Sequence, residues 1–285
     1  MTLSVFIAVL FAAILHASWN AIIKFGDDKL QGMVLLSIAH GIIGLFMLIL
    51  SPLPNINAWP WLIASVGFHL WYKLFLTSAY ERGDLSRVYP IARGAAPLLV
   101  LVLSSILIID NITNKDIFAV IAIGVGIFIL GIGVFKNKET IALLPFALCS
   151  AIGTAGYSIT DGLGARASGD VTSYIGWLFF LDAVVFMLYA FFRKGLNILP
   201  KKSSVWVLGL IAGSASVLAY WIAVWAMTIA PIALVAALRE TSVLFAVFIG
   251  VFFFKDSMGK SKIIASLIIV IGIIISRLEL DIAVE

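Results

Sequence analysis

The sequence predicts an all-α integral membrane protein with ten transmembrane helices, arranged as two inverted repeats of five helices. Composition is the first observation behind this prediction: of 285 residues, 62% are hydrophobic and 12% are charged, whereas soluble domains carry about a quarter charged residues. The second observation is that apolar runs of about 20 residues, the length that crosses a bilayer, recur along the whole chain. The third is a likeness between the two halves of the chain.

Ten apolar runs are the expected spans, and short turns rich in Pro, Gly, Asn and Asp separate them. The runs cover residues 3–24, 30–50, 60–80, 86–109, 115–135, 140–162, 171–192, 205–229, 232–254 and 260–277. No basic segment and no small-residue cleavage site mark the first run, so we expect a retained helix rather than a signal peptide. No turn is long enough for a soluble domain, and we therefore expect the functional site inside the helix bundle.

Several classes of site and partner are excluded by residue type. A single cysteine, Cys149, rules out a disulfide framework and a cysteine-based metal site. The chain has no phosphate-cradling loop, metal-ligand spacing or nucleophile elbow, so we expect neither a cofactor nor a metal. The pI of about 9.2 does not indicate nucleic acid, because the basic residues lie in turns between helices. The expected partners are the lipid bilayer and a small-molecule substrate, and we expect a monomer or a homodimer.

The basic residues predict the orientation of the spans. Thirteen of them occupy one set of alternate turns: Lys24, Lys29, Arg82, Arg87, Lys136, Lys138, Arg193, Lys194, Lys201, Lys202, Lys255, Lys260 and Lys262. Only three occupy the opposite set and the C-terminal tail: Lys115, Arg166 and Arg277. Short loops rich in Lys and Arg stay in the cytoplasm. We therefore expect both termini outside the cytoplasm and the protein in the cell inner (cytoplasmic) membrane.

Three pairs of residues match between the two halves of the chain. They share their residue type and an offset of 146 residues: Arg93 and Arg239, Asp110 and Asp256, and Gly126 and Gly272. We therefore expect residues 1–138 to form one five-helix repeat and residues 139–285 the second. Because five is odd, the second repeat enters the membrane from the opposite side. Inverted repeats are typical of secondary transporters, whose substrate site lies near the midplane at the repeat interface.

Two segments carry a resemblance to a known family. They are "SAYERGDLSRVYPIARGAAPLLVLVLSSILIIDNIT" (residues 78–113) and "WAMTIAPIALVAALRETSVLFAVFIGVFFFKDSM" (residues 225–258). Through them the chain resembles the ten-span EamA type of the drug/metabolite transporter superfamily, whose members repeat an apolar span followed by an acid, usually glutamate after glycine. Here Asp110 and Asp256 stand in that place without the glycine. The resemblance implies ten helices and transport, and it leaves open a substrate among amino acids, sugars, nucleotide-sugars, choline-like cations and organic anions.

Eight ionisable side chains fall well inside the expected spans, where an uncompensated charge costs several kcal/mol and is expected to serve the function. They are His16, His40, His69, Lys73, Arg93, Asp182, Arg239 and Glu240. At about 1.5 Å per residue, Arg93 and Arg239 lie about 10 Å apart along the membrane normal, a gap that a small metabolite would bridge. Adjacent residues on a helix diverge by about 100°, so we do not expect Arg239 and Glu240 simply to pair with each other.

The alternative for each of these residues is a structural role. The charges would then pair only with one another, and each histidine would bond a backbone carbonyl. His69 and Lys73 lie four residues apart on one helical face, which favours a common role for that pair. Four further charges fall at span ends, where a side chain reaches water without a functional reason: Lys24, Arg82, Asp161 and Arg166.

Four tryptophans inside the spans complete the expected substrate-binding set: Trp19, Trp71, Trp221 and Trp225. An indole ring can stack on an organic group or face a cation. Packing against neighbouring side chains explains each of these rings equally well.

A secondary active transporter working by alternating access explains the repeat, the intramembrane charges and the lack of a nucleotide-binding motif. Three cations, Lys73, Arg93 and Arg239, oppose Asp182 and Glu240, and the net charge of plus one suits a carboxylate held by an arginine fork. We expect a small zwitterionic or anionic metabolite, an amino acid or a similar compound. The alternatives are an exporter of a hydrophobic or quaternary cation, a channel, and an intramembrane lipid-modifying enzyme. Charges spread over six helices do not resemble an active site, so we expect no enzyme.

Protons are the expected coupling ion, and exchange without protons is the alternative. An anion bound at Arg239 would favour protonation of the neighbouring Glu240, so that substrate and proton bind together, as symport requires. His69 is the second candidate, because imidazole titrates near neutral pH.

Overall fold

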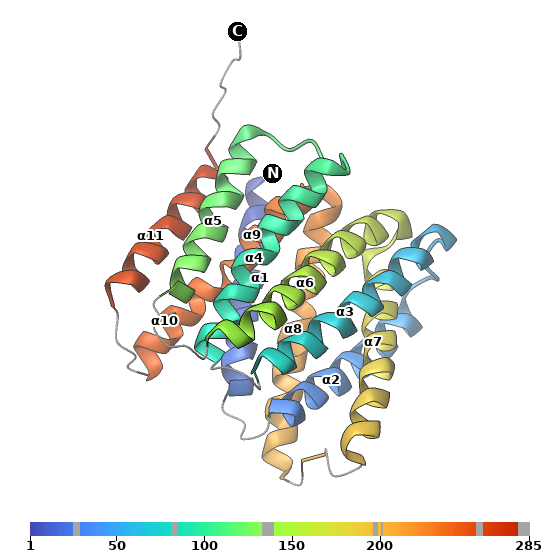
Figure 1. The fold of residues 1–285 in the computed structure, drawn as a ribbon. Helices are drawn as coiled ribbons and strands as arrows, with labels where there is room; N and C mark the ends of the chain where they lie inside the picture. Colours follow the sequence, from blue (N-terminus) through green and yellow to red (C-terminus); the bar gives the residue numbers. More distant parts are fainter. Residues whose placement is uncertain are drawn as a thin grey trace.

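The computed structural model describes residues 1–24, 29–80, 85–132, 140–195, 199–200, 202–254 and 259–278, and every regular element within them is helical (Figure 1). Helices suit these apolar runs because a helix satisfies its own backbone groups in lipid. The elements are α1 (Leu3–Lys24), α2 (Lys29–Leu50), the short 3-10 helix η1 (Ile56–Ala58), α3 (Trp59–Tyr80), α4 (Leu85–Ile106), α5 (Asn114–Ile132), α6 (Thr140–Ser168), α7 (Val171–Lys194), α8 (Ser203–Ile229), α9 (Ile232–Glu240), α10 (Ser242–Phe254) and α11 (Lys260–Ile275).

These helices follow the predicted spans within a few residues, with two informative differences. Helix α6 continues to Ser168, beyond its predicted end at residue 162. The ninth span is interrupted at Thr241, which separates α9 from α10. The Thr241 hydroxyl donates to the Leu238 carbonyl at 2.6 Å, and that oxygen would otherwise accept the N–H of Ser242 in a regular helix. A side chain thus competes with the backbone and stops the helix.

Six segments of the described residues are long and apolar enough to cross a membrane: Leu3–Ile22, Gln31–Leu50, Leu143–Ser168, Val171–Arg193, Ser203–Ile229 and Ile232–Phe252. Helices α3, α4, α5 and α11 pack in the same bundle, which gives ten helices when α9 and α10 are counted as one interrupted span. Large apolar side chains such as Ile49 and Phe192 are exposed on its outside, whereas Arg93 and Glu240 are buried. This distribution is typical of a protein surrounded by lipid, because charges avoid hydrocarbon.

The most extensive helix pairs join segments far apart in the sequence. Helix α2 packs along α7, α5 along α11, α3 along α6 and α1 along α8. Figure 1 shows α5 and α11 at one edge of the bundle and α2 and α7 at the other. A Cβ added to Gly126 would lie 3.0 Å from the Ala265 carbonyl oxygen, and one added to Gly272 would lie 3.0 Å from that of Ala119. Helices α5 and α11 therefore touch backbone to backbone at two points.

Helix α9 lies at the centre of the bundle, and all nine of its residues are buried (Figure 1). Its first N–H, that of Ile232, donates to Asp110 Oδ2 at 2.7 Å. Asp110 also pairs with Arg166 at 2.8 Å, and Arg166 donates to two carbonyls at the end of α8. Side chains thus fix where α9 begins. The counterpart of Asp110 in the expected repeat, Asp256, lies outside the described residues, as does the expected boundary at 138–139.

Candidate functional site

Two arginines from different helices converge on one carboxylate inside the bundle. Arg93 of α4 donates to Glu240 Oε1 at 3.1 Å and to Oε2 at 3.3 Å. Arg239 of α9 donates to the same Oε1 at 3.0 Å. All three side chains are at most 4% exposed. The gap that we expected a substrate to bridge between the two arginines therefore contains the Glu240 carboxylate.

The expectation that Arg239 and Glu240 would not pair with each other is wrong. The 100° divergence applies to Cβ directions, whereas a guanidinium on a long stem reaches around the helix. The helix also ends at Glu240, so no following turn of α9 separates the two side chains. A buried carboxylate without partners is costly, and three hydrogen bonds from two guanidinium groups satisfy this one.

Arg239 keeps one donor that no described residue accepts. Its Nε is buried without a partner, while Nη2 contacts Glu240 and lies 3.5 Å from the Tyr157 hydroxyl. His16 Nε2 and Trp19 Nε1 are also buried without partners in the described part of the chain, and their rings meet edge to face at 5.0 Å. Their helix, α1, packs against α9 and α10, and His16 interacts electrostatically with Arg239. The polar nitrogens without a described hydrogen-bond partner thus belong to Arg239 itself and to α1, the helix packed against α9.

Tyrosine rings connect Arg239 to His69. The Arg239 guanidinium lies 5.6 Å from the ring centroids of both Tyr157 and Tyr220. The His69 ring stacks on the same Tyr157 with centroids 4.2 Å apart and an angle of 13°. It meets Tyr220 edge to face at 5.6 Å. Arg239 and His69 therefore lie against the same two tyrosine rings.

Asp161 of α6 joins His69 in a second polar cluster. His69 Nε2 lies 3.2 Å from Asp161 Oδ2, the Tyr220 hydroxyl donates to the same oxygen, and Tyr174 donates to Oδ1 at 3.0 Å. Asp161 has no exposed surface, so the expectation that it reaches water at a span end is wrong. The cause is the length of α6, which continues to Ser168 and places Asp161 about two turns inside the helix.

Of the other three expected span-end charges, Arg166 is the one whose side chain the structure describes. Arg166 has a side chain that is 27% exposed and bound to Asp110. The side chain of Lys24 and the whole of Arg82 lie outside the described residues.

Lys73 and Asp182 form a third, closed pair between α3 and α7. The Lys73 Nζ lies 2.5 Å from Asp182 Oδ2. His40 Nε2 lies 3.1 Å from the Ser216 hydroxyl and interacts electrostatically with Lys73 and Asp182. His69 and Lys73 lie one turn apart on α3, as the spacing predicts, but they bind different acids.

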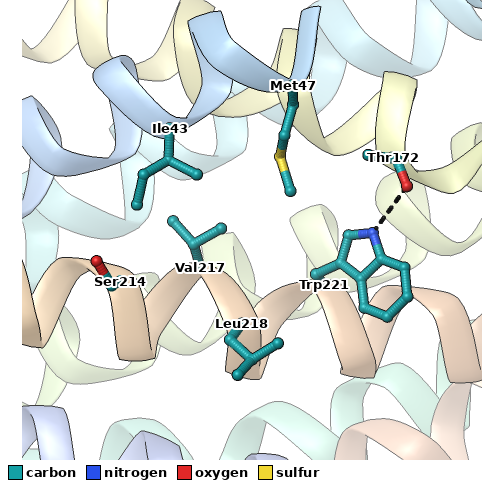
Figure 2. A pocket seen from close by; sticks show the side chains of 7 residues that line it. All are labelled: Ile43, Met47, Thr172, Ser214, Val217, Leu218 and Trp221. Atoms are coloured by element: carbon teal, nitrogen blue, oxygen red, sulfur yellow. Dashed lines mark hydrogen bonds between the residues drawn. The ribbon is translucent and has the colours of Figure 1, made fainter. Parts of the chain in front are cut away.

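The remaining tryptophans lie in other surroundings. Trp71 is 44% exposed and donates to the Cys149 carbonyl at 2.9 Å. Trp221 and Trp225 lie parallel with centroids 6.5 Å apart. Figure 2 shows Trp221, bonded to Thr172, at an apolar groove between α2, α7 and α8. The groove measures about 470 Å³ and is lined by Ile43, Met47, Thr172, Ser214, Val217, Leu218 and Trp221.

Sequence reasoning missed the tyrosines of the site. Tyr157 and Tyr220 fall in the middle of apolar runs, as Trp19 does, and a phenolic hydroxyl there needs a polar partner. That need was a usable signal, because both hydroxyls turn out to contact charged side chains.

Comparisons with known proteins agree with this arrangement. Residues 141–278 match the EamA-like transporter family. A solved structure titled only "Crystal structure of protein" is similar over 97% of both chains, with a TM-score of 0.77 and 17% sequence identity, which shows a shared fold. Curated proteins gave no match. The second half of the chain, residues 141–278, therefore belongs to the EamA-like transporter family, whose members are membrane transporters, and the shared fold extends over nearly the whole chain.

Proposed function

We propose that the protein is a secondary active transporter of a small anionic or zwitterionic metabolite, an amino acid or a similar compound, across the cytoplasmic membrane. The observation that carries the proposal is the convergence of Arg93 and Arg239 on Glu240. Buried charges away from the membrane surface are expensive and mark substrate and ion pathways. Two guanidinium groups provide planar forks for a carboxylate, and the unpartnered Nε of Arg239 is a donor still available to it. Glu240 is an acceptor for a substrate ammonium group.

The arrangement of helix pairs supports two inverted repeats moving by alternating access. In the expected repeat, α1, α2, α3, α4 and α5 correspond to α6, α7, α8, the α9–α10 span and α11. When each helix is replaced by its counterpart, the pairs α2–α7 and α5–α11 stay the same, and the pair α3–α6 becomes α1–α8. All four pairs are among the most extensive in the bundle. Rocking of one repeat against the other around a central site is the usual motion of such transporters. The arginines belong to α4 and α9, which are counterparts in this scheme and pack against each other.

The runner-up substrate is a hydrophobic or quaternary cation. Trp221 and its parallel neighbour Trp225 favour it, because indole faces attract cations. However, the groove beside Trp221 is lined by apolar and hydroxyl side chains without a carboxylate to balance the charge. Family membership supports transport rather than catalysis, and no enzymatic activity is proposed.

A thermal-shift screen of the purified protein followed by uptake into proteoliposomes tests the proposal. The panel contains L-amino acids, small mono- and dicarboxylates, and quaternary ammonium compounds. We expect carboxylate-bearing members to raise the Tm, and radiolabelled hits to show saturable uptake that the unlabelled compound competes away. The matched control for Arg239→Gln is Arg193→Gln, at the exposed end of α7. Stabilisation by cations alone, or uptake that never saturates, would contradict the proposal.

A further inference from the structure

Building on the proposed transport function, we propose that His69 and Asp161 form a proton-binding site that couples substrate movement to protons. This site differs from the Glu240 site that the sequence favours first for coupling. It lies beside the arginine cluster, behind Tyr157 and Tyr220.

Charge balance among the buried groups calls for such a site. Apart from Asp116 in the first turn of α5, the buried charged side chains of the described residues are three cations and three acids: Lys73, Arg93, Arg239, Asp161, Asp182 and Glu240. The net charge of plus one expected from the sequence omitted Asp161, and with it the charges cancel. A bound anion would leave one uncompensated negative charge in the membrane interior, which is costly. A proton taken up nearby restores the balance.

The partners of the three acids show which of them can serve in a proton-binding site without leaving a buried cation unpaired. Glu240 holds two guanidinium groups, and Asp182 holds the Lys73 ammonium at 2.5 Å. Protonating either acid would leave a buried cation without its counter-charge, which is strongly destabilising. Asp161 is instead held by two tyrosine hydroxyls and an imidazole. Among the described residues, it alone of these three acids has no lysine or arginine as a hydrogen-bond partner.

His69 is the group that accepts the proton. Its Nε2 faces the Asp161 carboxylate at 3.2 Å, so we assign the hydrogen of the neutral ring to Nε2. The other ring nitrogen, Nδ1, then carries a lone pair that takes the proton. The resulting imidazolium already has its counterion in place, because Asp161 accepts its N–H.

The rings of Tyr157 and Tyr220 link proton binding at His69 to substrate binding at Arg239. His69 stacks on the face of Tyr157, and the Arg239 guanidinium lies 5.6 Å from the centroid of the same ring. Because both groups lie against the same ring, a charged His69 and a charged Arg239 repel each other. An anion bound to Arg239 removes that repulsion, so anion and proton favour each other's binding. The other titratable or charged groups facing this region are Tyr72, Arg93, Tyr174, Tyr220, Glu240, and the Lys73–Asp182 pair with His40.

Nitrogen NMR of histidine-labelled protein in detergent tests proton binding without any substrate. The chain has only three histidines, His16, His40 and His69, so His69→Gln assigns the signal. We expect the His69 ring to gain a proton as the pH is lowered, and to lose this step in Asp161→Asn. A wild-type His69 ring whose protonation state stays the same at every pH at which the protein remains folded overturns the proposal.

Proteoliposome uptake tests coupling, with a radiolabelled pool of L-amino acids and small carboxylic acids as the probe. For one proton per anion, a one-unit pH gradient, acid outside, raises accumulation by about tenfold. We expect His69→Gln and Asp161→Asn to lose this response while still exchanging labelled for unlabelled pool at equal pH. Tyr220→Phe, which removes one donor to Asp161, weakens the response, whereas the matched control Tyr189→Phe on α7 keeps it.

The outcomes separate the two proposals. Absence of both uptake and exchange in the wild type sinks the transport function itself. Normal exchange with gradient-independent accumulation, or a full gradient response in both His69→Gln and Asp161→Asn, sinks the proton site alone.

Discussion

Arg93 and Arg239 donate to the same oxygen of Glu240, at 3.1 and 3.0 Å. One carboxylate is therefore the shared counterion of two buried cations, which lie 146 residues apart in the chain. The loss of the shared acid is more damaging than the loss of either arginine, because it exposes two unpaired charges to a low-dielectric interior.

Glu240→Gln is expected to lower the free energy of unfolding by about 3–5 kcal/mol, the cost of breaking a buried ion pair from one side. Arg93→Gln is expected to cost less, because Arg239 still satisfies Glu240. Denaturant titration in detergent measures both variants, with Arg193→Gln as the control expected to stay within about 0.5 kcal/mol of the wild type. A Glu240→Gln protein as stable as the control would show that the cluster is not a paired unit.

Arg239→Lys is expected to weaken substrate binding by about tenfold or more, because lysine keeps the charge but loses the planar fork, and 1.4 kcal/mol corresponds to a factor of ten. Isothermal titration with the strongest hit of the thermal-shift panel measures the change. Normal affinity in Arg239→Lys would exclude a bidentate contact, and normal affinity in Arg239→Gln would remove Arg239 from the site.

Gly126→Val and Gly272→Val are each expected to destabilise the protein by about 1–3 kcal/mol, the usual cost of overpacking. A Cβ at either position meets a carbonyl oxygen of the facing helix at 3.0 Å, and backbone cannot yield as a flexible side chain does. Gly67→Ala is the control, since a Cβ there meets nothing within 4 Å. Thermal unfolding of the three variants gives the comparison, and equal Tm values would contradict the close crossing of α5 and α11.

Asp110→Ala is expected to lower stability by about 1–2 kcal/mol, because Asp110 both caps α9 at the Ile232 N–H and pairs with Arg166. Asp110→Asn keeps an oxygen for the cap and loses only the ion pair, so it is expected to cost less. The difference in unfolding free energy between the two variants separates cap from charge. If Asn and Ala were equally harmful, the cap would contribute nothing.

The C-terminus is expected outside the cytoplasm, from the thirteen-to-three distribution of basic residues in alternate turns. The Arg277 guanidinium donates to the Met1 carbonyl at 2.9 Å, which puts Arg277 and the N-terminus on one side of the bundle. A C-terminal reporter that is active only in the cytoplasm is therefore expected to be silent. Strong reporter activity would invert the proposed orientation.

The helices could be predicted from the sequence because each depends on a local property, the length of an apolar run. The first span was expected at 3–24 and is Leu3–Lys24. The intramembrane charges could also be found, because a charge inside an apolar run is visible without knowledge of its neighbours. Asp161 was misjudged because α6 is longer than the bilayer needs, so a residue that a minimal span would place at the surface lies deep inside.

The partners of those charges could not be predicted, because they depend on how helices pack. Arg239 and Glu240 pair at the end of α9, next to Thr241, whose hydroxyl donates to the Leu238 carbonyl. Nothing in the sequence distinguishes Thr241 from a threonine inside a continuous helix. The sharing of Glu240 with Arg93 requires α4 and α9 to be neighbours, which the matched offset of 146 residues suggested but could not place in space.

The ion pair between Asp110 and Arg166 is partly exposed, whereas the ion pairs of Glu240 are buried. Its strength therefore depends on the salt concentration of the surrounding water. Arg166 is 27% exposed and Asp110 is 9% exposed, so dissolved ions reach one end of this bridge. At physiological ionic strength, charges in water are screened beyond about 8 Å, and this distance shortens as salt rises. Salt is therefore expected to weaken this partly exposed bridge more than the fully buried contacts between Glu240 and its two arginines.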